Sequence, residues 1–319
     1  MILYNGAAGG LGRHLAAPLL RRGEPWHALG ARLEDQAGLA VELRQLDPRG
    51  RVTFIHLAAR VSVPACEADP SGAYQTNVVL ARETVATVLT WAAELGVSAR
   101  VIYVSSGHVY AAQPDGSRVD EDGPTLPRSV YAQTKLAAEE ALRSLSVSSG
   151  VPILVARVFG LIAPRQSAHY VLPALIERAW GARFEGIPGL DYVRDYLDAR
   201  DVCEDLLLLA SADWLETSLV VNVCSGAPVT IRELLHAILL EIVPERADDV
   251  ARHATSAPGR SDDIRWLVGD PSRFTRLVRA LPNHIPLSAT VADAVASDAI
   301  PAAASGAGRG ATDLAQSTR

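Results

Sequence analysis

Residues 2–12 read ILYNGAAGGLG and join a short apolar run to three regularly spaced glycines, Gly6, Gly9 and Gly12. A helical run follows at residues 13–22. Glycines in this pattern permit a tight turn and let backbone amides approach a pyrophosphate at the N-terminus of a helix, where the helix dipole favours an anion. A glycine-rich linker would not require a strand before it and a helix after it. This stretch therefore predicts the first strand, loop and helix of a dinucleotide-binding fold.

The second predicted strand, at residues 26–30, is followed by an arginine rather than an acid. In a dinucleotide-binding fold, an acidic residue at this strand end binds the ribose 2′-hydroxyl of NAD, whereas an arginine accommodates the 2′-phosphate of NADP. Here Arg32 comes first, and the acids Glu34 and Asp35 come later. The pattern favours NADP. NAD stays the alternative, in which Arg32 is a solvated loop residue.

Apolar and helical stretches alternate along the first half of the chain. Strands are predicted at residues 52–59, 101–104 and 151–159, with helices at 77–95 and 131–145 between them. This alternation is typical of an α/β fold with a doubly wound parallel sheet. The interval between the second and third strands has room for one helix but hardly for another strand. We therefore expect the edge strand there to be reduced or missing.

The sequence pattern changes after residue 160, where helices mix with Gly- and Pro-rich loops. We expect a dinucleotide-binding domain at residues 1–160 and a smaller α/β substrate-binding region at 161–300. A strand at 219–224 should return to the main sheet, and a helix capped by Thr230 should follow it. Residues 301–319 are Ala, Gly, Ser and Thr without periodicity, and predict a disordered tail.

Three polar residues at the centre of the chain form a candidate catalytic group. The strand at 101–104 runs into a turn with Ser106, and Tyr131 and Lys135 share one face of the next helix, about 5–6 Å apart. A free tyrosine titrates near ~10, and a nearby ammonium would lower its pKa, so that the phenol becomes usable as a general acid or base. Ser106 would hold the substrate oxygen. Helix packing is the alternative for the Tyr–Lys pair alone, whereas the upstream glycine loop favours catalysis.

Composition excludes several classes of protein. The 319 residues carry a formal net charge of −6, with 49% hydrophobic and 21% charged residues, which is typical of a soluble globular protein without a nucleic-acid surface. Cys66, Cys203 and Cys224 are isolated, so we interpret them as reduced thiols of a cytoplasmic protein and expect no metal site. No apolar run reaches about 18 residues, and the chain begins with a strand. We therefore expect neither a membrane span nor a signal peptide.

The order and spacing of the motifs resemble the extended short-chain dehydrogenase/reductases, the NAD(P)-dependent nucleotide-sugar epimerase/dehydratase family, over about residues 1–297. Besides the glycine loop and the Tyr131/Lys135 pair, the matching pieces are His56-Leu57-Ala58-Ala59, Asn77, Val104-Ser105-Ser106, Arg194-Asp195-Tyr196 and Pro258-Gly259-Arg260. Within the family, residues 194–202, 222–226, 231–234 and 268–270 look most like the branch of GDP-4-keto-6-deoxy-mannose reductase and GDP-mannose 4,6-dehydratase.

The resemblance implies a Rossmann-type sheet and assigns the site residues. It gives catalysis to Ser106, Tyr131 and Lys135. It places NADP, or NAD, against Gly6, Gly9, Gly10, Leu11, Gly12, Arg32, Leu57, Ala58, Ala59, Asn77, Val104, Tyr131, Lys135 and Val158. It places a nucleotide-diphosphate sugar against His108, Gly160, Gln166, Arg194 and Arg260.

Two departures from the family pattern bear on the reaction. The dehydratases of the family carry an Asp-Glu pair after the catalytic Ser or Thr, whereas here Ser106 is followed by Gly107 and His108. The family also often has an asparagine three residues after the arginine of the next core strand, where this chain has Gly160. We expect His108 to line the pocket rim rather than to replace a missing acid, and His56, inside an apolar run, to be a core residue.

These features predict an NADPH-dependent reductase of a nucleotide-linked 4-keto-6-deoxy sugar. An NAD-dependent nucleotide-sugar 4-epimerase is the first alternative, and a non-catalytic dinucleotide-sensing protein is the second. The complete set of Ser106, Tyr131 and Lys135 favours an enzyme over a sensor. Tightly held NAD would favour the epimerase, because an epimerase returns its hydride to the same sugar.

Two further expectations concern charge and assembly. Arg194 and Arg260 should clamp the substrate diphosphate, unless they pair with acids such as Asp195 or Asp262. The helices at 77–95 and 131–145 should form a homodimer interface. The first of them carries more apolar residues than one sheet face should need, and the alternative is that all are buried within one chain: Val78, Val79, Val85, Val88, Leu89 and Trp91.

Overall fold

A computed structural model describes the protein at residues 1–168, 170–282 and 284–305. Its main sheet has six strands in the order β10-β5-β4-β3-β1-β2, and every neighbouring pair is parallel. Short apolar and β-branched runs form these strands, as the sequence predicts. The strands are β1 (Ile2–Tyr4), β2 (Trp26–Ala28), β3 (Val52–His56), β4 (Ala99–Ser106), β5 (Ile153–Val158) and β10 (Leu219–Val223).

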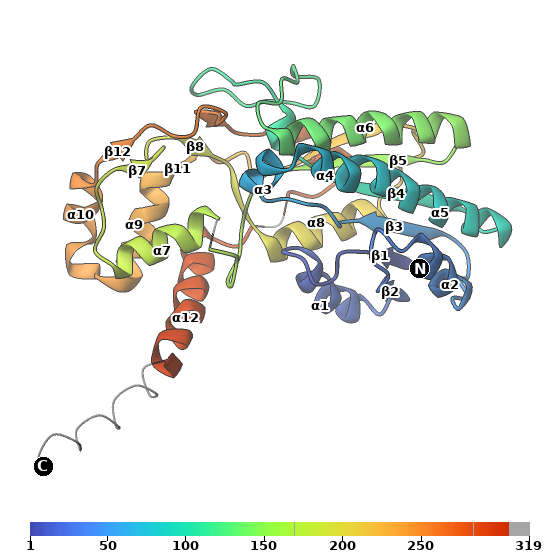
Figure 1. Ribbon diagram of the computed structural model, residues 1–319, viewed down its shortest axis with the longest axis horizontal. Helices are drawn as coiled ribbons and strands as arrows, with labels where there is room; N and C mark the ends of the chain where they lie inside the picture. Colours follow the sequence, from blue (N-terminus) through green and yellow to red (C-terminus); the bar gives the residue numbers. More distant parts are fainter. Residues whose placement is uncertain (169, 283, 306–319) are drawn as a thin grey trace, which may run out of the picture.

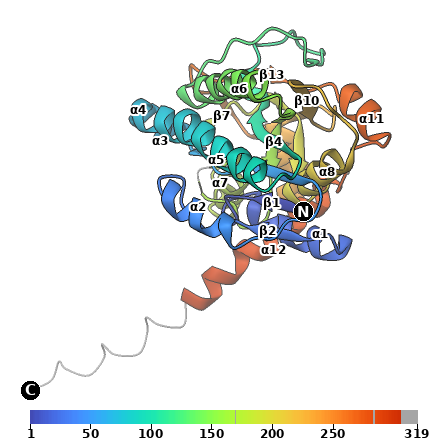
Figure 2. The ribbon, with the colours of Figure 1, turned by 90° about the vertical axis from the view of Figure 1, so that its right-hand side faces the viewer.

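Helices cover both faces of the sheet, which confirms the doubly wound α/β fold (Figures 1 and 2). The side chains of α2, α5 and α6 pack in one core on one face, and those of α1 and α8 pack in another on the opposite face. The bounds are α1 (Gly12–Arg22), α2 (Gln36–Arg44), α5 (Ala81–Glu94), α6 (Val130–Ser149) and α8 (Ala199–Ser211).

The expected loss of an edge strand is confirmed. In the described part of the chain, β2 is the last strand on its side of the sheet, and α2 leads from it directly towards β3. The third predicted strand is shorter than expected, because β3 ends at His56 and residues 57–59 turn away from it. The fourth is longer, because β4 continues to Ser106 and so carries the serine turn on the strand itself.

The helix predicted at 77–95 has a more complex beginning. Two short helices, α3 (Val63–Ala68) and α4 (Pro70–Tyr74), lead into a π-helical segment at Gln75–Leu80, and α5 follows without a break. Asn77 lies within the π-helical turn. Such turns are often found at functional sites.

The apolar residues that suggested a homodimer are accounted for within one chain. Five of the six are buried, and they belong to the core between the sheet and the helices α2, α5 and α6: Val78, Val85, Val88, Leu89 and Trp91. They are buried because α5 lies between α2 and α6, so its flanks as well as its base are covered. These side chains give no evidence for an interface between two copies.

A third core lies at one end of the sheet, in the C-terminal region (Figure 1). It is built by four helices, α7 (Val171–Trp180), α9 (Ile231–Ile242), α10 (Ala247–His253) and α12 (Leu287–Ser305). As predicted, β10 returns to the main sheet and Thr230 caps α9, where Glu233 completes a capping box. Because α12 is helical to Ser305, its last turn overlaps the expected tail at 301–319, and residues 306–319 lie outside the described part.

Short strand pairs and turns complete the described chain. None of the described helices is long and apolar enough to cross a membrane. The remaining elements are β6 (Gly160–Ile162), β7 (Ile187–Pro188), β8 (Val193–Arg194), β9 (Tyr196–Asp198), β11 (Val229–Thr230), β12 (Ser256–Ala257), β13 (Trp266–Leu267), α11 (Ser272–Val278) and two 3₁₀ turns at Gly107–Val109 and Pro244–Arg246.

Candidate active site

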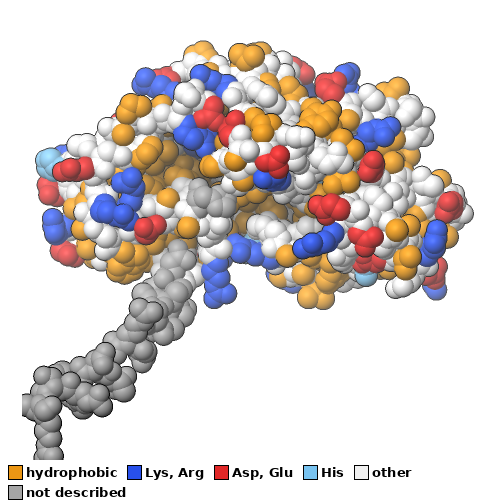
Figure 3. Space-filling model, viewed as in Figure 1, with side chains coloured by type: hydrophobic (Ala, Val, Ile, Leu, Met, Phe, Trp, Pro, Cys, Tyr) orange, Lys and Arg blue, Asp and Glu red, His pale blue; other side chains and the backbone are white. Residues whose placement is uncertain are grey.

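A cleft of about 840 Å³ lies between the carboxyl ends of β1, β3, β4 and β5 and the C-terminal region. This edge of a parallel sheet is where ligands bind in open α/β folds. Hydrophobic side chains are visible in the hollow between the two parts of the molecule (Figure 3). Most residues predicted for the cofactor line this cleft: Gly6, Gly9, Gly10, Leu11, Gly12, Leu57, Ala58, Ala59, Val104, Tyr131, Lys135 and Val158.

The glycine loop has the close backbone contacts that its pattern predicts. Gly6 adopts a left-handed φ of 70°, and a Cβ there would lie 2.9 Å from the backbone nitrogen of Ala58. A Cβ on Gly12 would overlap the carbonyl oxygen of Gly6 and lie 2.7 Å from its carbonyl carbon. The loop is thus folded tightly onto the start of α1, where its amides can meet a pyrophosphate.

Asn5 joins the loops that follow β1 and β3, and sequence analysis did not identify it. Its side-chain oxygen accepts hydrogen bonds from the amides of Leu57 and Ala58, at 2.8 and 3.0 Å. Its side-chain nitrogen lies 3.1 Å from Nδ1 of His56, which is buried and stacks on Tyr103. His56 is therefore a core residue, as expected, and Asn5 fixes the cradle for the cofactor.

The region after β2 is organised by an acid from α2. The Glu42 carboxylate accepts hydrogen bonds from the amides of Gly30 (2.9 Å) and Ala31 (3.1 Å), which holds this loop in place. Arg32 follows, exposed, and its guanidinium has no hydrogen bond or ion pair with the described residues. Arg32 is not among the lining residues, although the neighbouring Leu33 is.

Asn77 lies behind the cleft wall rather than on it. Its side chain accepts from the amide of Arg60 (2.7 Å), and it donates to the Arg60 carbonyl (3.0 Å) and to Oγ1 of Thr134 (2.9 Å). The side chain is buried and its hydrogen bonds are used within the protein. Asn77 thus positions the loop after β3 against α6 and does not itself line the cofactor cleft.

The three predicted catalytic residues meet in the cleft. Tyr131, Ser106 and Lys135 all line the cleft. Burial raises the pKa of Tyr131 to about 12, while the nearby Ser106 hydroxyl opposes this change. Burial also lowers the pKa of Lys135 to about 7, and the nearby Glu139 opposes that shift.

One electrostatic expectation is therefore wrong. We expected Lys135 to lower the pKa of Tyr131, but among the protein's own groups burial dominates and the pKa rises. The Lys135 ammonium lies 4.4 Å from the centre of the Tyr103 ring, a cation–π contact rather than an ion pair with the phenol. The phenol of Tyr131 is thus held neutral, which is the form that donates a proton.

A buried ion pair lies one helical turn beyond Lys135, and the sequence pattern did not reveal it. Arg157 of β5 binds Glu139 of α6 through Nη2 at 2.7 Å and Nε at 3.2 Å, and Ser105 donates to the same carboxylate. Glu139 lies one helical turn after Lys135. Because its charge is shared by Arg157, Glu139 opposes the fall in the Lys135 pKa but does not cancel it.

The segment after Ser106 lacks an acid–base pair and is tightly packed. A Cβ on Gly107 would lie 3.0 Å from the ring of Phe159, so this ring would have to shift by a few tenths of an ångström to admit a side chain there. His108 lines the cleft, and its amide donates to Oγ of Ser106 at 3.2 Å. Burial and then Arg194 lower the His108 pKa to about 4, so its imidazole is neutral at pH 7 and lacks the proton that an acid would give.

The remaining predicted substrate residues fall into two groups. Gly160, Arg194 and Arg260 line the cleft, whereas Gln166 does not and donates to the Leu161 carbonyl at 3.0 Å. A Cβ on Gly160 would lie 2.7 Å from the Asp195 carbonyl oxygen, so β6 and β9 pair too closely for the asparagine found in relatives.

Both arginines of the expected clamp have acid partners. Nη2 of Arg194 lies 2.5 Å from Asp263, and Nε of Arg260 lies 3.1 Å from Asp262. Arg260 thus pairs with one of the two acids named as alternatives, and Arg194 pairs with a different acid. Both arginines line the cleft, and their role as a diphosphate clamp stays a prediction. Asp195 instead accepts from Ser225, Gly226 and Gly269 and anchors its turn.

No cluster of metal-ligating side chains occurs among the residues that the structure describes. The cleft has the elements of a cofactor-dependent proton-transfer site. These are a glycine cradle for a dinucleotide, a neutral phenol that lines the cleft with a serine, and a buried lysine one helical turn away.

Comparison with known proteins agrees with this description. Residues 2–224 match the model of the NAD dependent epimerase/dehydratase family. The chain is 30% identical over 260 residues to GDP-6-deoxy-D-mannose reductase of Pseudomonas aeruginosa, covering 79% of this chain and 84% of that protein. It is 29% identical over 278 residues to dTDP-6-deoxy-L-talose 4-dehydrogenase (NAD(P)(+)) of Kitasatospora kifunensis, covering 82% and 84%.

The solved structure of RMD from Pseudomonas aeruginosa complexed with NADPH superposes with a TM-score of 0.75 at 27% identity, over 93% of this chain and 98% of that chain. UDP-glucose 4-epimerase of Thermus thermophilus in complex with NAD also gives a TM-score of 0.75, at 25% identity over 93% and 98%.

Proposed function

The chain belongs to the NAD-dependent epimerase/dehydratase family, and we propose that it reduces the keto group of a nucleotide-linked 4-keto-6-deoxy sugar with NADPH. It is an NAD(P)-dependent enzyme of the extended short-chain dehydrogenase/reductase type. The substrate class follows relatives named for GDP- and dTDP-linked 6-deoxy sugars.

One observation favours reduction over dehydration as the reaction of this enzyme. Tyr131 is a neutral proton donor that shares the cleft with Ser106, while the position after Ser106 is a glycine packed against Phe159. Elimination of water needs an acid and a base in addition to the phenol, and His108 is neutral. Reduction of a ketone needs only one proton, delivered to the oxygen that becomes an alkoxide.

The protein's own groups would act as follows. The glycine loop binds the pyrophosphate of the cofactor, and Lys135 holds its ribose. NADPH, when bound, supplies the hydride to the carbonyl carbon. Ser106 orients the carbonyl oxygen, and Tyr131 gives it a proton as the C–O double bond becomes a single bond. Tyr131 has a pKa of about 12, and an alkoxide is a far stronger base than the phenolate that Tyr131 would become. Proton transfer from Tyr131 to the alkoxide is therefore energetically favourable.

Arg32 should set the choice between NADPH and NADH. Its guanidinium is exposed after β2 and uncommitted among the described residues, as a contact to a 2′-phosphate requires. We expect Arg32→Ala to raise the KM for NADPH by about tenfold or more, the worth of a hydrogen bond to a charged group, and to change the KM for NADH little. Steady-state kinetics with both cofactors measures this.

The control for Arg32 is Arg44→Ala at the end of α2. Arg44 is also exposed and lies outside the cleft, so its loss should affect both cofactors equally and weakly. Equal changes in both KM values for Arg32→Ala would show that Arg32 only faces solvent.

Turnover of a chemically prepared 4-keto-6-deoxy sugar linked to GDP or dTDP tests the proposed function directly. Stoichiometric oxidation of NADPH, with one product bearing a new hydroxyl, is the expected result. NAD that stays bound through purification, together with interconversion of two 4-epimers and no net oxidation, would instead support the epimerase. Failure of both reactions would leave the proposal without support.

Two expectations remain predictions. The first is the homodimer, which the apolar residues at 78–91 no longer support, because five of the six are buried within one chain. A cytoplasmic location rests on the isolated cysteines, all three of which are buried and unpaired in the structure.

A further inference from the structure

Residues 258–263, here called the wall segment, form part of the wall of the active-site cleft. Gly259, Arg260 and Asp263 line the cleft. Strand pairing holds the chain on both sides of the segment, because β12 pairs with β7 and β13 pairs with β8. Between these anchors, the backbone–backbone hydrogen bond found among the described residues is internal, from the amide of Asp263 to the carbonyl of Arg260 at 3.0 Å. The wall segment therefore depends on side chains from other elements to hold its backbone in place.

Arg128 supplies such a contact from the dinucleotide-binding part of the chain. Its Nη1 donates to the carbonyl of Asp263 at 3.0 Å, and its Nη2 donates to the carbonyl of Ser261 at 3.2 Å. The two donors belong to one planar guanidinium, so they hold the two carbonyls in a fixed relation to each other. Arg128 is not among the residues that line the cleft. It can act on a ligand only through the wall segment.

The position of Arg128 in the chain links the wall segment to the catalytic helix. Arg128 lies three residues before Tyr131, in the turn that leads into α6. Other contacts fix this turn as well, because the Ser129 side chain caps α6 and the amide of Val130 donates to Glu67 at 2.7 Å. The start of α6 should therefore keep its place when the Arg128 side chain is removed, whereas the wall segment loses two hydrogen bonds.

We propose that Arg128 is a positioning residue, which ties the wall segment to the start of the catalytic helix and so preorganises the cleft for the sugar substrate. The inference rests on the proposed function, because it concerns how the cleft receives the nucleotide-linked sugar. With both hydrogen bonds in place, Arg260 and Asp263 are held at the cleft before the substrate arrives. Without them, binding must also order the wall segment, and the affinity falls by the cost of that ordering.

A contact that only stabilises the fold would have a different signature. Its loss would lower the melting temperature, and any effect on ligands would reach NADPH and the sugar alike. A contact that preorganises the wall segment acts on the sugar alone, because the glycine loop and Lys135 lie on other elements. It also acts on KM rather than kcat, because the geometry around Tyr131 is restored once the sugar is bound.

Steady-state kinetics of Arg128→Ala tests this split, with the GDP- or dTDP-linked 4-keto-6-deoxy sugar that the wild type turns over. We expect the KM for the sugar to rise by about tenfold, the worth of one hydrogen bond from a charged donor. The KM for NADPH and the kcat at saturating sugar should stay within about twofold of wild type. Arg128→Lys should recover part of the loss, because an ammonium is a donor without the planar fork.

Hydrogen–deuterium exchange provides a second readout that does not depend on turnover. It is measured on the full chain loaded with NADPH and without sugar. Peptides that cover residues 258–264 should exchange several-fold faster in Arg128→Ala than in wild type, because their backbone is less ordered. Peptides from the first turns of α6 should exchange at the wild-type rate, since the Ser129 cap is intact.

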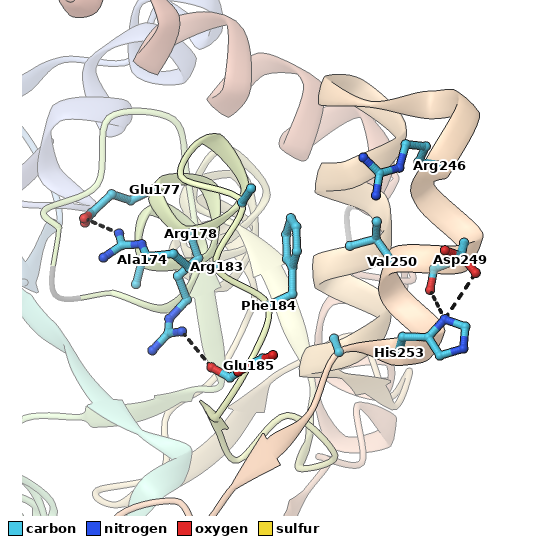
Figure 4. A pocket seen from close by; sticks show the side chains of 12 residues that line it. Ala174, Glu177, Arg178, Arg183, Phe184, Glu185, Arg246, Asp249, Val250 and His253 are labelled. Atoms are coloured by element: carbon cyan, nitrogen blue, oxygen red, sulfur yellow. Dashed lines mark hydrogen bonds and ion pairs between the residues drawn. The ribbon is translucent and has the colours of Figure 1, made fainter.

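Arg183→Ala is the matched control. Arg183 is also exposed and belongs to the C-terminal region, where it binds Glu177 at 2.8 Å. It lines a separate cleft of about 910 Å³ between α7 and α10 (Figure 4). Its loss should change neither the KM for the sugar nor the exchange at residues 258–264. An equal rise in KM in Arg183→Ala would show that any lost arginine of the region has this effect, and would overturn the proposal.

The remaining outcomes separate this inference from the proposed function. An unchanged KM for the sugar in Arg128→Ala, or an equal rise in the KM for NADPH, overturns the role of Arg128 and leaves the proposed function standing. A wild-type protein that turns over no such sugar overturns the proposed function, and unchanged exchange at residues 258–264 would then overturn the contact made by Arg128 as well. If Arg128→Ala does not fold, Arg128→Lys decides by the same measurements, with an expected rise in the KM for the sugar of about threefold.

Discussion

Replacing Tyr131 by phenylalanine should lower kcat of the proposed reduction by about 10²- to 10⁴-fold, the usual worth of a positioned general acid. The substitution removes only the phenolic oxygen, which lies in the cleft with Ser106 and is held neutral by burial. Without it, the alkoxide formed by hydride transfer has no proton donor of suitable strength within the site. Pre-steady-state measurement of NADPH oxidation separates this loss from any change in product release.

The accompanying measurements test whether the loss is chemical. NADPH affinity and melting temperature should stay near wild type, because the aromatic ring is retained. Tyr74→Phe is the control, since Tyr74 is half exposed and lies outside the cleft. Retention of more than about a tenth of kcat would remove Tyr131 from the role of proton donor.

The pH dependence follows from the same pKa. With the Tyr131 pKa raised to about 12, the phenol keeps its proton throughout the neutral range, and the reductive kcat should not fall through its ionisation between about pH 6 and pH 9. A phenol whose pKa was instead lowered towards 7 would lose its proton as the pH rises and would slow the reduction. Stopped-flow rates across this range distinguish the two cases.

The fold could be predicted because local patterns specify it. The run ILYNGAAGGLG by itself indicates a strand, a tight turn and the start of a helix. The interval between Arg32 and Val52 is too short for a helix and a further strand, which predicts that the edge strand is missing. Ser106, Tyr131 and Lys135 could be found for a similar reason. Two of them share a helix face and the third ends a parallel strand, so their meeting follows from the topology.

What the sequence did not reveal depends on contacts between distant residues. Asn5 holds amides more than fifty positions away, and Glu139 is paired with Arg157 on another element. The pairing of Arg194 with Asp263, 69 positions further along the chain, likewise depends on how the two segments are placed. No local spacing encodes such pairs.

The pKa of Tyr131 also depends on tertiary contacts that the sequence does not show. Spacing along a helix predicts that Lys135 shares its face, but it does not predict how deeply the phenol is buried. Burial dominates the shift, and Lys135 instead lies against the ring of Tyr103. The apolar residues at 78–91 show the same limit, because a count along one helix does not show how many neighbours cover it.

A single methyl group on Gly12 should remove most of the affinity for the cofactor. In Gly12→Ala the new Cβ would overlap the carbonyl oxygen of Gly6 and lie 2.8 Å from the Cα of Ala7, both of them backbone atoms that no side-chain rotation can move aside. The loop must therefore open, and the amides that meet the pyrophosphate are displaced. Loss of two hydrogen bonds to a charged group, at about 1.5–3 kcal/mol each, corresponds to a rise in the NADPH dissociation constant of at least about 100-fold.

Gly10→Ala provides the contrast for this prediction. Gly10 lies in the same loop, but a Cβ there meets no protein atom within 4 Å, and its φ is not left-handed. The free energy of unfolding of the Gly10→Ala protein should stay within about 1 kcal/mol of wild type. In Gly12→Ala, overpacking should lower the free energy of unfolding by about 1–3 kcal/mol. Urea titration followed by tryptophan fluorescence measures both, and fluorescence of bound NADPH reports the affinity of Gly12→Ala. A Gly12→Ala protein with unchanged stability and cofactor affinity would show that the loop relaxes around the methyl group and that close backbone approach is not what holds the pyrophosphate.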